Sequence, residues 1–373
     1  MIFSINKKDI SEKLQYLMGI VPSKSTMMVL ANFKLETDKE TNTLTIVATD
    51  LNIITIIKIP ANVVENGTLL VSAKHLSDII NSLPDTVINF SVSEDHLIIE
   101  CENSNFTINY IESSLFPEIN VINTTTQYKV DSDNFKKLIQ NTMFCASTDV
   151  GQPICNGVFL RLEQDLLTMA ATDTKRIGEA KCKAEINLET PYEIVLPTRA
   201  LNFLEKNIHN DSETILIKFN EHQISFALQG VLLISNKYEG RYPTYTVAFR
   251  NPTNYSLMVD KSKMKDAVRR VSLLSEDDDK LIKISLNNSE VKIESIISER
   301  GNAKESISGF SYDGPECFFC LNAKFLTSFL NVIESDEVLI KFRSTEEPIW
   351  VLNNINFEML EIRFIVMPMR INR

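Results

Sequence analysis

Two aspartates are the first candidates for chemistry, because each ends the same tripeptide. Ala-Thr-Asp ends at Asp50 and again at Asp173. Paired carboxylates work as general acid and base only when they converge on one cleft. The repeat described below puts these two at equivalent places in separate domains, and Asp commonly accepts hydrogen bonds from backbone N–H groups in turns. We therefore interpret both as turn residues at strand ends.

A cysteine pair is the second candidate. Cys317-Phe-Phe-Cys320 has motif spacing, but a zinc site needs a second pair of ligands, and the four histidines, His75, His96, His209 and His222, offer no matching spacing. The sequence also lacks a Gly-rich phosphate loop, His-Glu-x-x-His and Gly-x-Ser-x-Gly. We expect two reduced cysteines in an apolar strand, and a protein that is not an enzyme and uses no cofactor or metal.

Composition limits the class of protein. The chain has 373 residues, 44% of them hydrophobic and 23% charged, and a formal net charge of -11. This acidity is present in each third of the chain and excludes tight nucleic-acid binding by bulk electrostatic attraction. The first residues lack the apolar run of a signal peptide, and no later stretch has the length of a membrane span. We expect a cytoplasmic protein without a membrane partner.

The elements that must position these residues recur three times. A basic residue takes the same place in three similar segments, as Lys74, Arg199 and Lys324, each 125 positions after the last. Earlier segments over 6–18, 131–143 and 260–272 each open on Asn or Asp, residues that cap a helix start. Repeats of this length have their own cores, so the sequence predicts three similar domains over 1–124, 125–251 and 252–373.

Each repeat is expected to be an α+β unit. Its order is a strand, a capped helix, several strands, a second helix and a strand hairpin. Alternating apolar and polar residues over 96–101, 106–110 and 222–227 indicate strands of antiparallel sheet. The fold class is therefore α+β, with two helices and antiparallel sheets in every domain.

The helices are amphipathic. At 100° per residue, the core faces of the first helices take nine residues: Ile10, Leu14 and Leu17, then Phe135, Leu138 and Ile139, then Met264, Val268 and Val271. The opposite faces keep basic or neutral polar residues: Lys8, Gln15 and Tyr16, then Lys137, Gln140 and Asn141, then Arg269 and Arg270. On the second helices, Lys74, Arg199, Lys206 and Lys324 point outward by the same count. A polar helix face is commonly only a solvated face, but its repetition in an acidic protein leaves contact with DNA equally open, and Glu12, Asp78, Asp133 and Asp266 lie on or near it.

Three further segments carry a resemblance to a known family. The C-terminal run Val366-Met-Pro-Met-Arg-Ile371 is rich in methionine, an adaptable side chain on surfaces that accept varied peptides, and Pro368 suits a sheet edge. Together with Ala171-Thr-Asp-Thr-Lys-Arg-Ile177 and Glu239-Gly-Arg-Tyr-Pro-Thr-Tyr245, it resembles the bacterial DNA sliding clamps, the β subunits of replicative DNA polymerase. The resemblance covers the whole chain, including the threefold repeat.

The resemblance implies a processivity factor. Two subunits of three domains would join head to tail in a six-domain ring around duplex DNA, with twelve helices lining the hole and sheets outside, in the cytoplasm at the nucleoid. It implies DNA contacts at Lys24 and Lys74, and the helix faces add Lys137, Arg199, Arg269 and Arg270. Phe106 and the pair Leu273-Leu274 fall where the family forms its dimer interface.

A peptide-binding pocket between the middle and last domains is also implied. It would take short linear peptides of polymerases, the clamp loader and repair proteins, and the apolar groove with flanking polar groups suits such ligands. The matching positions are Cys155, Thr172, Thr174, Lys175, Arg176, Ile177, Pro243, Val247, Asn322, Phe325, Val366, Met367, Pro368, Met369 and Arg370.

Several positions depart from the family's pattern. Gln152 stands where an arginine is usual, which weakens a DNA contact, and Cys155 makes one pocket wall smaller. Thr174 and Lys175 replace a more usual Gly and His, and the acidic run 277–279 puts Asp279 where an aromatic pocket residue can stand. Peptide preference is therefore expected to differ.

Two other functions stay open on the sequence. A nucleic-acid enzyme on the repeat scaffold would use Asp50 and Asp173 with a divalent metal as a nuclease. A purely structural dimer would bind peptides but no DNA.

Overall fold

The computed structural model describes residues 1–22, 27–149, 151–209, 214–250, 253–275, 280–296, 301–353 and 360–370. The chain forms two compact units. Unit 1 consists of 1–136 and 196–237, and unit 2 of 137–195 and 238–373. The middle third of the chain is thus shared between the two.

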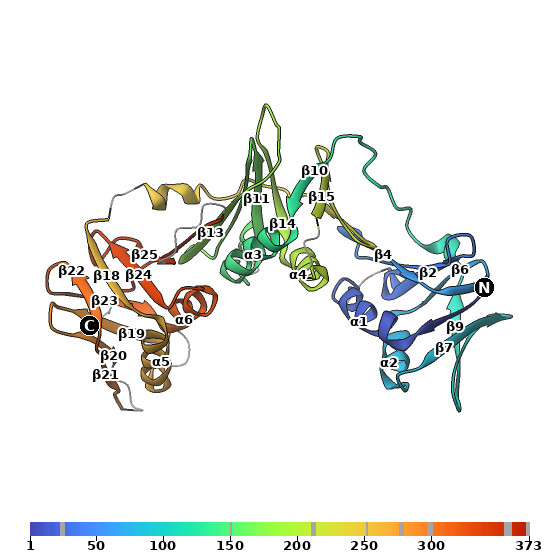
Figure 1. Ribbon diagram of the computed structural model, residues 1–373, viewed down its shortest axis with the longest axis horizontal. Coiled ribbons are helices and arrows are strands. Elements are labelled where there is room, and N and C mark those ends of the chain that lie inside the picture. Colours follow the sequence, from blue (N-terminus) through green and yellow to red (C-terminus); the bar gives the residue numbers. More distant parts are fainter. Residues whose placement is uncertain are drawn as a thin grey trace. The chain divides into compact units, whose positions relative to one another are not determined.

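Six helices recur at the predicted places (Figure 1). The first helix of each repeat is α1 (Lys7–Met18), α3 (Ser132–Thr142) or α5 (Lys261–Val271), and the second is α2 (Ala73–Ser82), α4 (Thr198–Asn207) or α6 (Ala323–Val332). Within unit 1, α1 and α2 pack side by side, and in unit 2 α5 and α6 do the same. The predicted positions of the helices are confirmed, and so is the packing of the first pair and of the last pair.

The predicted caps are only partly confirmed. The carboxylates of Asp131 and Asp260 accept hydrogen bonds from the N–H groups of Asn134 (2.9 Å) and Lys263 (2.8 Å) at the starts of α3 and α5. The expected cap at Asn6 is wrong, because its side chain makes no cap bond and its amide instead donates to Asp9 at 3.3 Å.

Unit 1 is built on an antiparallel sheet of 13 strands in the order β10-β15-β16-β17-β4-β3-β2-β6-β9-β8-β7-β1-β5. Strands β17 and β4 pair antiparallel, so this sheet joins the first repeat to part of the middle one. The strands are β1 (Ile2–Asn6), β2 (Asn32–Asp38), β3 (Thr43–Thr49), β4 (Ile53–Pro60), β5 (Asn62–Glu65), β6 (Gly67–Ser72), β7 (Val87–Ser93), β8 (His96–Cys101), β9 (Ser104–Ile111), β10 (Tyr128–Asp131), β15 (Thr214–Phe219), β16 (Gln223–Leu228) and β17 (Val231–Asn236).

Unit 2 has a sheet of nine strands, β14-β11-β12-β13-β26-β25-β24-β18-β22, and one of four, β21-β20-β19-β23. The antiparallel pair β13 and β26 joins the middle repeat to the last. The strands are β11 (Gly157–Glu163), β12 (Leu166–Thr172), β13 (Arg176–Lys183), β14 (Tyr192–Pro197), β18 (Tyr255–Asp260), β19 (Leu281–Leu286), β20 (Val291–Ser295), β21 (Lys304–Ile307), β22 (Phe310–Asp313), β23 (Cys317–Asn322), β24 (Glu337–Phe342), β25 (Ile349–Asn353) and β26 (Leu360–Val366).

Short 3-10 turns connect these elements. They are η1 (Met28–Ala31), η2 (Ser113–Leu115), η3 (Met143–Cys145), η4 (Pro153–Asn156), η5 (Tyr245–Phe249) and η6 (Ser272–Leu274). Three of them, η3, η4 and η5, lie next to the positions that the sequence singles out in unit 2.

The core faces of the helices are those that the sequence predicts. All nine predicted core residues of the first helices are at most 1% exposed. One outward prediction is wrong: Asn141 is only 4% exposed, and its amide donates back to the Lys137 carbonyl at 2.8 Å. A helix position at the border of the two faces can bury a polar group when it finds a partner in the preceding turn.

Candidate functional site

The two Ala-Thr-Asp segments form the same turn. The Asp173 carboxylate accepts hydrogen bonds from the backbone N–H groups of Lys175 (3.0 Å) and Arg176 (2.9 Å). Asp50 does the same for Asn52 (3.0 Å) and Ile53 (2.7 Å). The prediction that these aspartates hold turns at strand ends is confirmed.

The residue after each aspartate has a left-handed backbone conformation. Thr174 has φ of 73° and Leu51 has φ of 76°. The hydroxyl of Thr172 stabilises the Asp173 turn. It accepts a hydrogen bond from the Thr174 N–H at 3.0 Å and donates one to the Arg176 carbonyl at 2.7 Å. A β-branched side chain is rare in this conformation, so the loop is held by its hydrogen bonds against a local preference.

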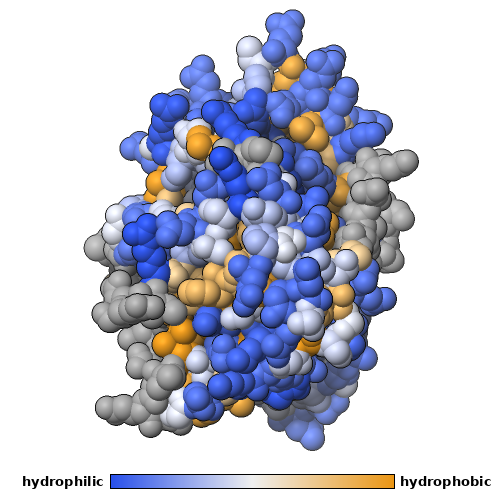
Figure 2. Space-filling view, turned by 90° about the vertical axis from the view of Figure 1, so that its left-hand side faces the viewer, coloured by the Kyte–Doolittle hydropathy of each residue, from blue (hydrophilic) through white to orange (hydrophobic). Residues whose placement is uncertain are grey.

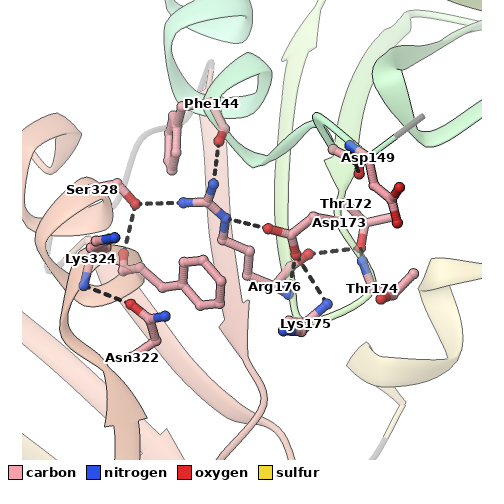
Figure 3. A network of polar contacts seen from close by, with 12 residues as sticks. Phe144, Asp149, Thr172, Asp173, Thr174, Lys175, Arg176, Asn322, Lys324 and Ser328 are labelled. Atoms are coloured by element: carbon pink, nitrogen blue, oxygen red, sulfur yellow. Dashed lines mark hydrogen bonds and ion pairs between the residues drawn. The ribbon is translucent and has the colours of Figure 1, made fainter. Parts of the chain in front are cut away.

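Arg176 is the centre of a contact network that ties the Asp173 turn to two other elements of unit 2 (Figure 3). Its guanidinium donates to the Asp173 carboxylate (2.9 Å), to the Ser328 hydroxyl in α6 (2.9 Å) and to the Phe144 carbonyl in η3 (2.7 Å). The ring of Phe325 lies 4.4 Å from the guanidinium carbon. The arginine therefore has a partner in the turn, in η3 and in α6.

The C-terminal segment runs beside this turn. Arg176 in β13 pairs with Val366 in β26, and beyond the strand the Met367 N–H donates to the Lys175 carbonyl at 2.9 Å. The Met369 N–H donates to the Cys320 carbonyl at 2.8 Å. The strand β26 pairs on both sides, with β13 and β25, so the edge expected from Pro368 begins only after Val366. The side chain of Met367 is 38% exposed.

The segment that carries Pro243 and Val247, both exposed, is connected to the Asp173 turn through Tyr242. Tyr242, next to Pro243, accepts the Thr172 N–H on its hydroxyl oxygen at 3.1 Å. Tyr242 and Tyr245 belong to a buried cluster against which Ile177 packs. This segment is thus attached to the base of the Asp173 turn.

Of the other predicted pocket residues, Asn322 caps a helix and Cys155 is buried. The Asn322 side chain accepts the Lys324 N–H at 2.9 Å and caps α6. Cys155 in η4 is 2% exposed, and burial raises the pKa of its thiol. Its neighbour Ile154 packs against the tyrosine cluster, whereas Gln152 is exposed. Asp279 lies outside the described residues.

A groove of about 690 Å³ follows the C-terminal segment in unit 2. It is lined by Lys283, Glu316, Cys317, Phe318, Phe319, Cys320, Thr345, Glu346, Pro368, Met369 and Arg370. Arg370 pairs with Glu346 at 3.5 Å. Cys317 and Cys320 lie in strand β23, as predicted. The face of unit 2 in Figure 2 is mainly hydrophilic, with small separate hydrophobic areas.

The predicted DNA contacts have different surroundings. Lys74 is exposed, and Lys24 lies outside the described residues. Arg199 donates to the Asp50 carboxylate (2.9 Å) and to the Gly19 carbonyl (3.2 Å) after α1. Lys137 pairs with Glu334 at 3.5 Å.

The two arginines of α5 are paired as well. Arg269 lies 3.6 Å from Asp266. Arg270 donates to both carboxylate oxygens of Glu305, at 2.9 and 2.5 Å, and this contact lowers the pKa of Glu305.

Sequence reasoning missed a basic cluster at the end of α4 in unit 1. Lys13 of α1 donates to the Asn207 side chain at 3.3 Å and lies 3.5 Å from the His209 ring. Lys136 of α3 donates to the Ile208 carbonyl at 3.1 Å. The ammonium groups of Lys13 and Lys206 lie 6.0 and 5.9 Å from the centre of the Tyr16 ring. Single helices gave no signal for it, because the cations come from three of them.

The predicted dimer residues lie at an open strand edge and a turn. Phe106 is half-buried in β9, which pairs with β8 from Ser104 to Asn109 and with β6 only at Tyr110 and Ile111. Leu273 in η6 is 70% exposed, and Leu274 is half-buried.

Across the described ranges, no group of three or more His, Cys, Asp or Glu side chains could hold a metal ion. The same ranges contain no helix long and apolar enough to cross a membrane.

Three family models match the chain in order. They are the N-terminal, central and C-terminal domains of the DNA polymerase III beta subunit, over residues 1–120, 129–244 and 249–370. Among curated proteins, the beta sliding clamp of Bacillus subtilis is 27% identical over 93% of this chain and 94% of its own, and that of Rickettsia felis is 25% identical over 98% and 99%.

Solved structures agree on the fold. A sliding clamp from Bacillus subtilis superposes with a TM-score of 0.91 at 24% identity, and one from Pseudomonas aeruginosa bound to griselimycin with 0.92 at 23%, each covering 100% of both chains. The chain therefore belongs to the DNA polymerase III beta subunit family, the beta sliding clamps, and its function is that of a DNA polymerase processivity factor.

Proposed function

We propose that two copies of this chain close head to tail into a ring around duplex DNA and slide along it without sequence preference. The observation that carries the proposal is the threefold recurrence of two helices among antiparallel strands, with the first and the last pair packed side by side. Three such domains, over 1–124, 125–251 and 252–373, would give twelve helices in a dimer. No catalytic step is assigned to the ring.

Encirclement explains how an acidic protein holds DNA. A ring stays on DNA by topology, so the net charge of -11 does not have to be overcome by strong attraction. Lys24, Lys74, Lys137, Gln152, Arg199, Arg269 and Arg270 are proposed to face the DNA. The ion pairs of Lys137, Arg199 and Arg270 reduce the charge that these residues offer.

The pocket in unit 2 is proposed to bind short peptides of the polymerase, the clamp loader and repair proteins. Its three walls are the Asp173 turn, the segment with Pro243 and Val247, and the segment from Met367 to Arg370, with Phe325 nearby. Methionine and valine give an adaptable apolar surface, and the fixed Arg176 with its neighbours gives a polar edge. Griselimycin, which the Pseudomonas aeruginosa relative binds, is proposed as a probe of this pocket.

Loading the protein on DNA of two shapes tests the ring. With a clamp loader and ATP, the protein should stay on nicked circular duplex and leave the same duplex once it is cut to a linear form. Gel filtration of the labelled protein with each DNA measures retention. Equal retention on both forms would contradict the topological mechanism.

The pocket is tested by Met367→Ala, which removes an exposed apolar side chain beside the Asp173 turn. We expect the dissociation constant of griselimycin to rise at least tenfold, while retention on nicked circles with a preloaded clamp is unchanged. Met28→Ala is the matched control, because Met28 is 85% exposed in unit 1. Unchanged affinity in Met367→Ala would count against this pocket.

A further inference from the structure

A buried ion pair joins the two strands that meet below the pocket. Glu179 in β13 is only 2% exposed. Its carboxylate accepts a hydrogen bond from Arg363 Nε in β26 at 3.0 Å and a second one from the same guanidinium. Lys181 adds a contact at 3.3 Å. A buried carboxylate requires such partners, since an unpaired charge in the interior is strongly destabilising.

The pair belongs to the register that builds the pocket. Glu179 lies directly opposite Arg363 in the β13–β26 ladder, and in the same ladder Arg176 lies opposite Val366. Because side chains alternate along a strand, Glu179 and Ile177 share one face of β13, and Arg176 lies on the other. The two faces of this strand therefore carry the ion pair and the Arg176 network.

The wall with Pro243 and Val247 rests on this pair. The Tyr245 hydroxyl is hydrogen-bonded to the Glu179 carboxylate, and burial with this contact raises the pKa of Tyr245. The Phe249 ring lies 4.4 Å from the guanidinium carbon of Arg363 and packs edge-on against Trp350 with ring centres 5.7 Å apart. Both ends of η5 are thus attached to the two charged side chains.

We propose that Glu179 and Arg363 are positioning residues for the peptide pocket, which fix the segment from Tyr242 to Phe249 relative to the C-terminal segment. The inference rests on the proposed pocket. Glu179 contacts Arg363 and Tyr245, and Arg363 contacts Glu179 and Phe249. Removal of either charge therefore releases one end of η5. The pair touches no peptide itself and acts through Tyr245 and Phe249.

An apolar double variant separates positioning from stability. Replacing both charges together, as Glu179→Leu with Arg363→Met, leaves no unpaired buried charge, and such replacements are often neutral for stability. It also removes the acceptor of Tyr245 and the cation over Phe249. We expect unfolding temperatures within a few degrees of the parent, but a griselimycin dissociation constant at least tenfold higher.

Single variants and a control complete the design. Arg363→Met should weaken griselimycin binding and lower stability, and Arg363→Lys should restore part of both, since it keeps the charge without the planar group. Arg161→Met is the control, because Arg161 makes partly exposed ion pairs with Glu163 and Glu193 in the same sheet. It should change affinity less than twofold. Emission of Trp350, the one tryptophan in the chain, reports on the Phe249 contact.

Two outcomes distinguish failure of the inference from failure of the pocket. A stable double variant that binds griselimycin like the parent, while Met367→Ala does not, overturns the positioning role and leaves the pocket intact. If neither variant weakens binding, the pocket proposal fails and the positioning role fails with it.

Discussion

At the scale of single residues, the Asp173 turn shows how much a loop can be constrained by its hydrogen bonds. The side chains of Asp173 and Thr172 make four of them and fix a turn in which Thr174 has a left-handed backbone conformation. The family resemblance leads one to expect glycine at this position, which would adopt the conformation without strain. Thr174 thus adds backbone strain to a turn beside the proposed binding pocket.

We expect Thr174→Gly to stabilise unit 2 by up to about 1 kcal/mol, because relief of the left-handed strain exceeds the entropy that glycine adds to the unfolded chain. Denaturant unfolding of both proteins gives the difference. Thr174→Ala is the control, since it keeps a Cβ in the same conformation and should gain less. A loss of stability in the glycine variant would show that the threonine is not strained.

At the scale of elements, arginines connect helices to turns. In unit 1, Arg199 at the start of α4 donates to the carbonyls of Gly19 and Ile20, just after α1, and to Asp50. In unit 2, Arg176 reaches η3, α6 and Asp173. Each repeated aspartate thus holds both its own turn and an arginine.

Arg199→Ala is expected to lower the free energy of unfolding by about 1 kcal/mol, a value reduced because the side chain is 44% exposed. The reason is that the carbonyls after α1 and the Asp50 carboxylate lose their donor. Urea unfolding measures the change. Lys74→Ala is a matched control at the equivalent position of α2, where the side chain is exposed, and should have almost no effect. Equal losses in both variants would contradict the role of Arg199.

The ion pair between Arg270 in α5 and Glu305 in β21 predicts that stability depends on pH. Arg270 lowers the pKa of Glu305, so the carboxylate contributes full stability above its unfolded pKa of about 4.3 and loses this contribution as the pH falls. Arg270→Ala should therefore lower the unfolding temperature at pH 7, and the difference from the parent should shrink towards pH 3. Arg269→Ala is the control, since its ion pair is longer, at 3.6 Å. A difference that stays constant with pH would contradict the assignment.

At the scale of the whole molecule, the proposed ring needs an interface between copies. Leu273 is 70% exposed, and among the described strands the edge of β9 beside Phe106 pairs with no strand from Ser104 to Asn109. An exposed leucine and an open edge are features that association can cover. Leu273 and Phe106, which lies at that edge, are residues that the resemblance assigns to the dimer interface.

Leu273→Asp should convert the dimer to monomers of 42.4 kDa, because burying a charge at the interface costs more than the contact provides. Sedimentation over a range of concentrations gives the dissociation constant, which we expect to rise at least a hundredfold. Phe318→Asp, at a residue that is 52% exposed in β23, is the control and should leave the dimer intact. A dimeric Leu273→Asp variant would exclude this interface.

Features that depend on residues close together in the chain could be predicted from the sequence. Helical periodicity gave the buried face of every first helix, the repeated spacing gave the helix pairs, and Ala-Thr-Asp gave the turns at Asp50 and Asp173. Each of these is local, because the atoms concerned lie within a few residues of one another.

Partners that lie far apart in the chain could be identified only once the chain was seen folded. Sequence periodicity could not show that Glu179 meets Arg363, 184 positions away, or that three helices bring Lys13, Lys136 and Lys206 to one place. It also could not show that Asn6 leaves its helix uncapped or that the middle repeat is shared between two compact units. The physical reason is that strand pairing and helix packing choose these contacts, and both depend on the register of segments that are distant in sequence.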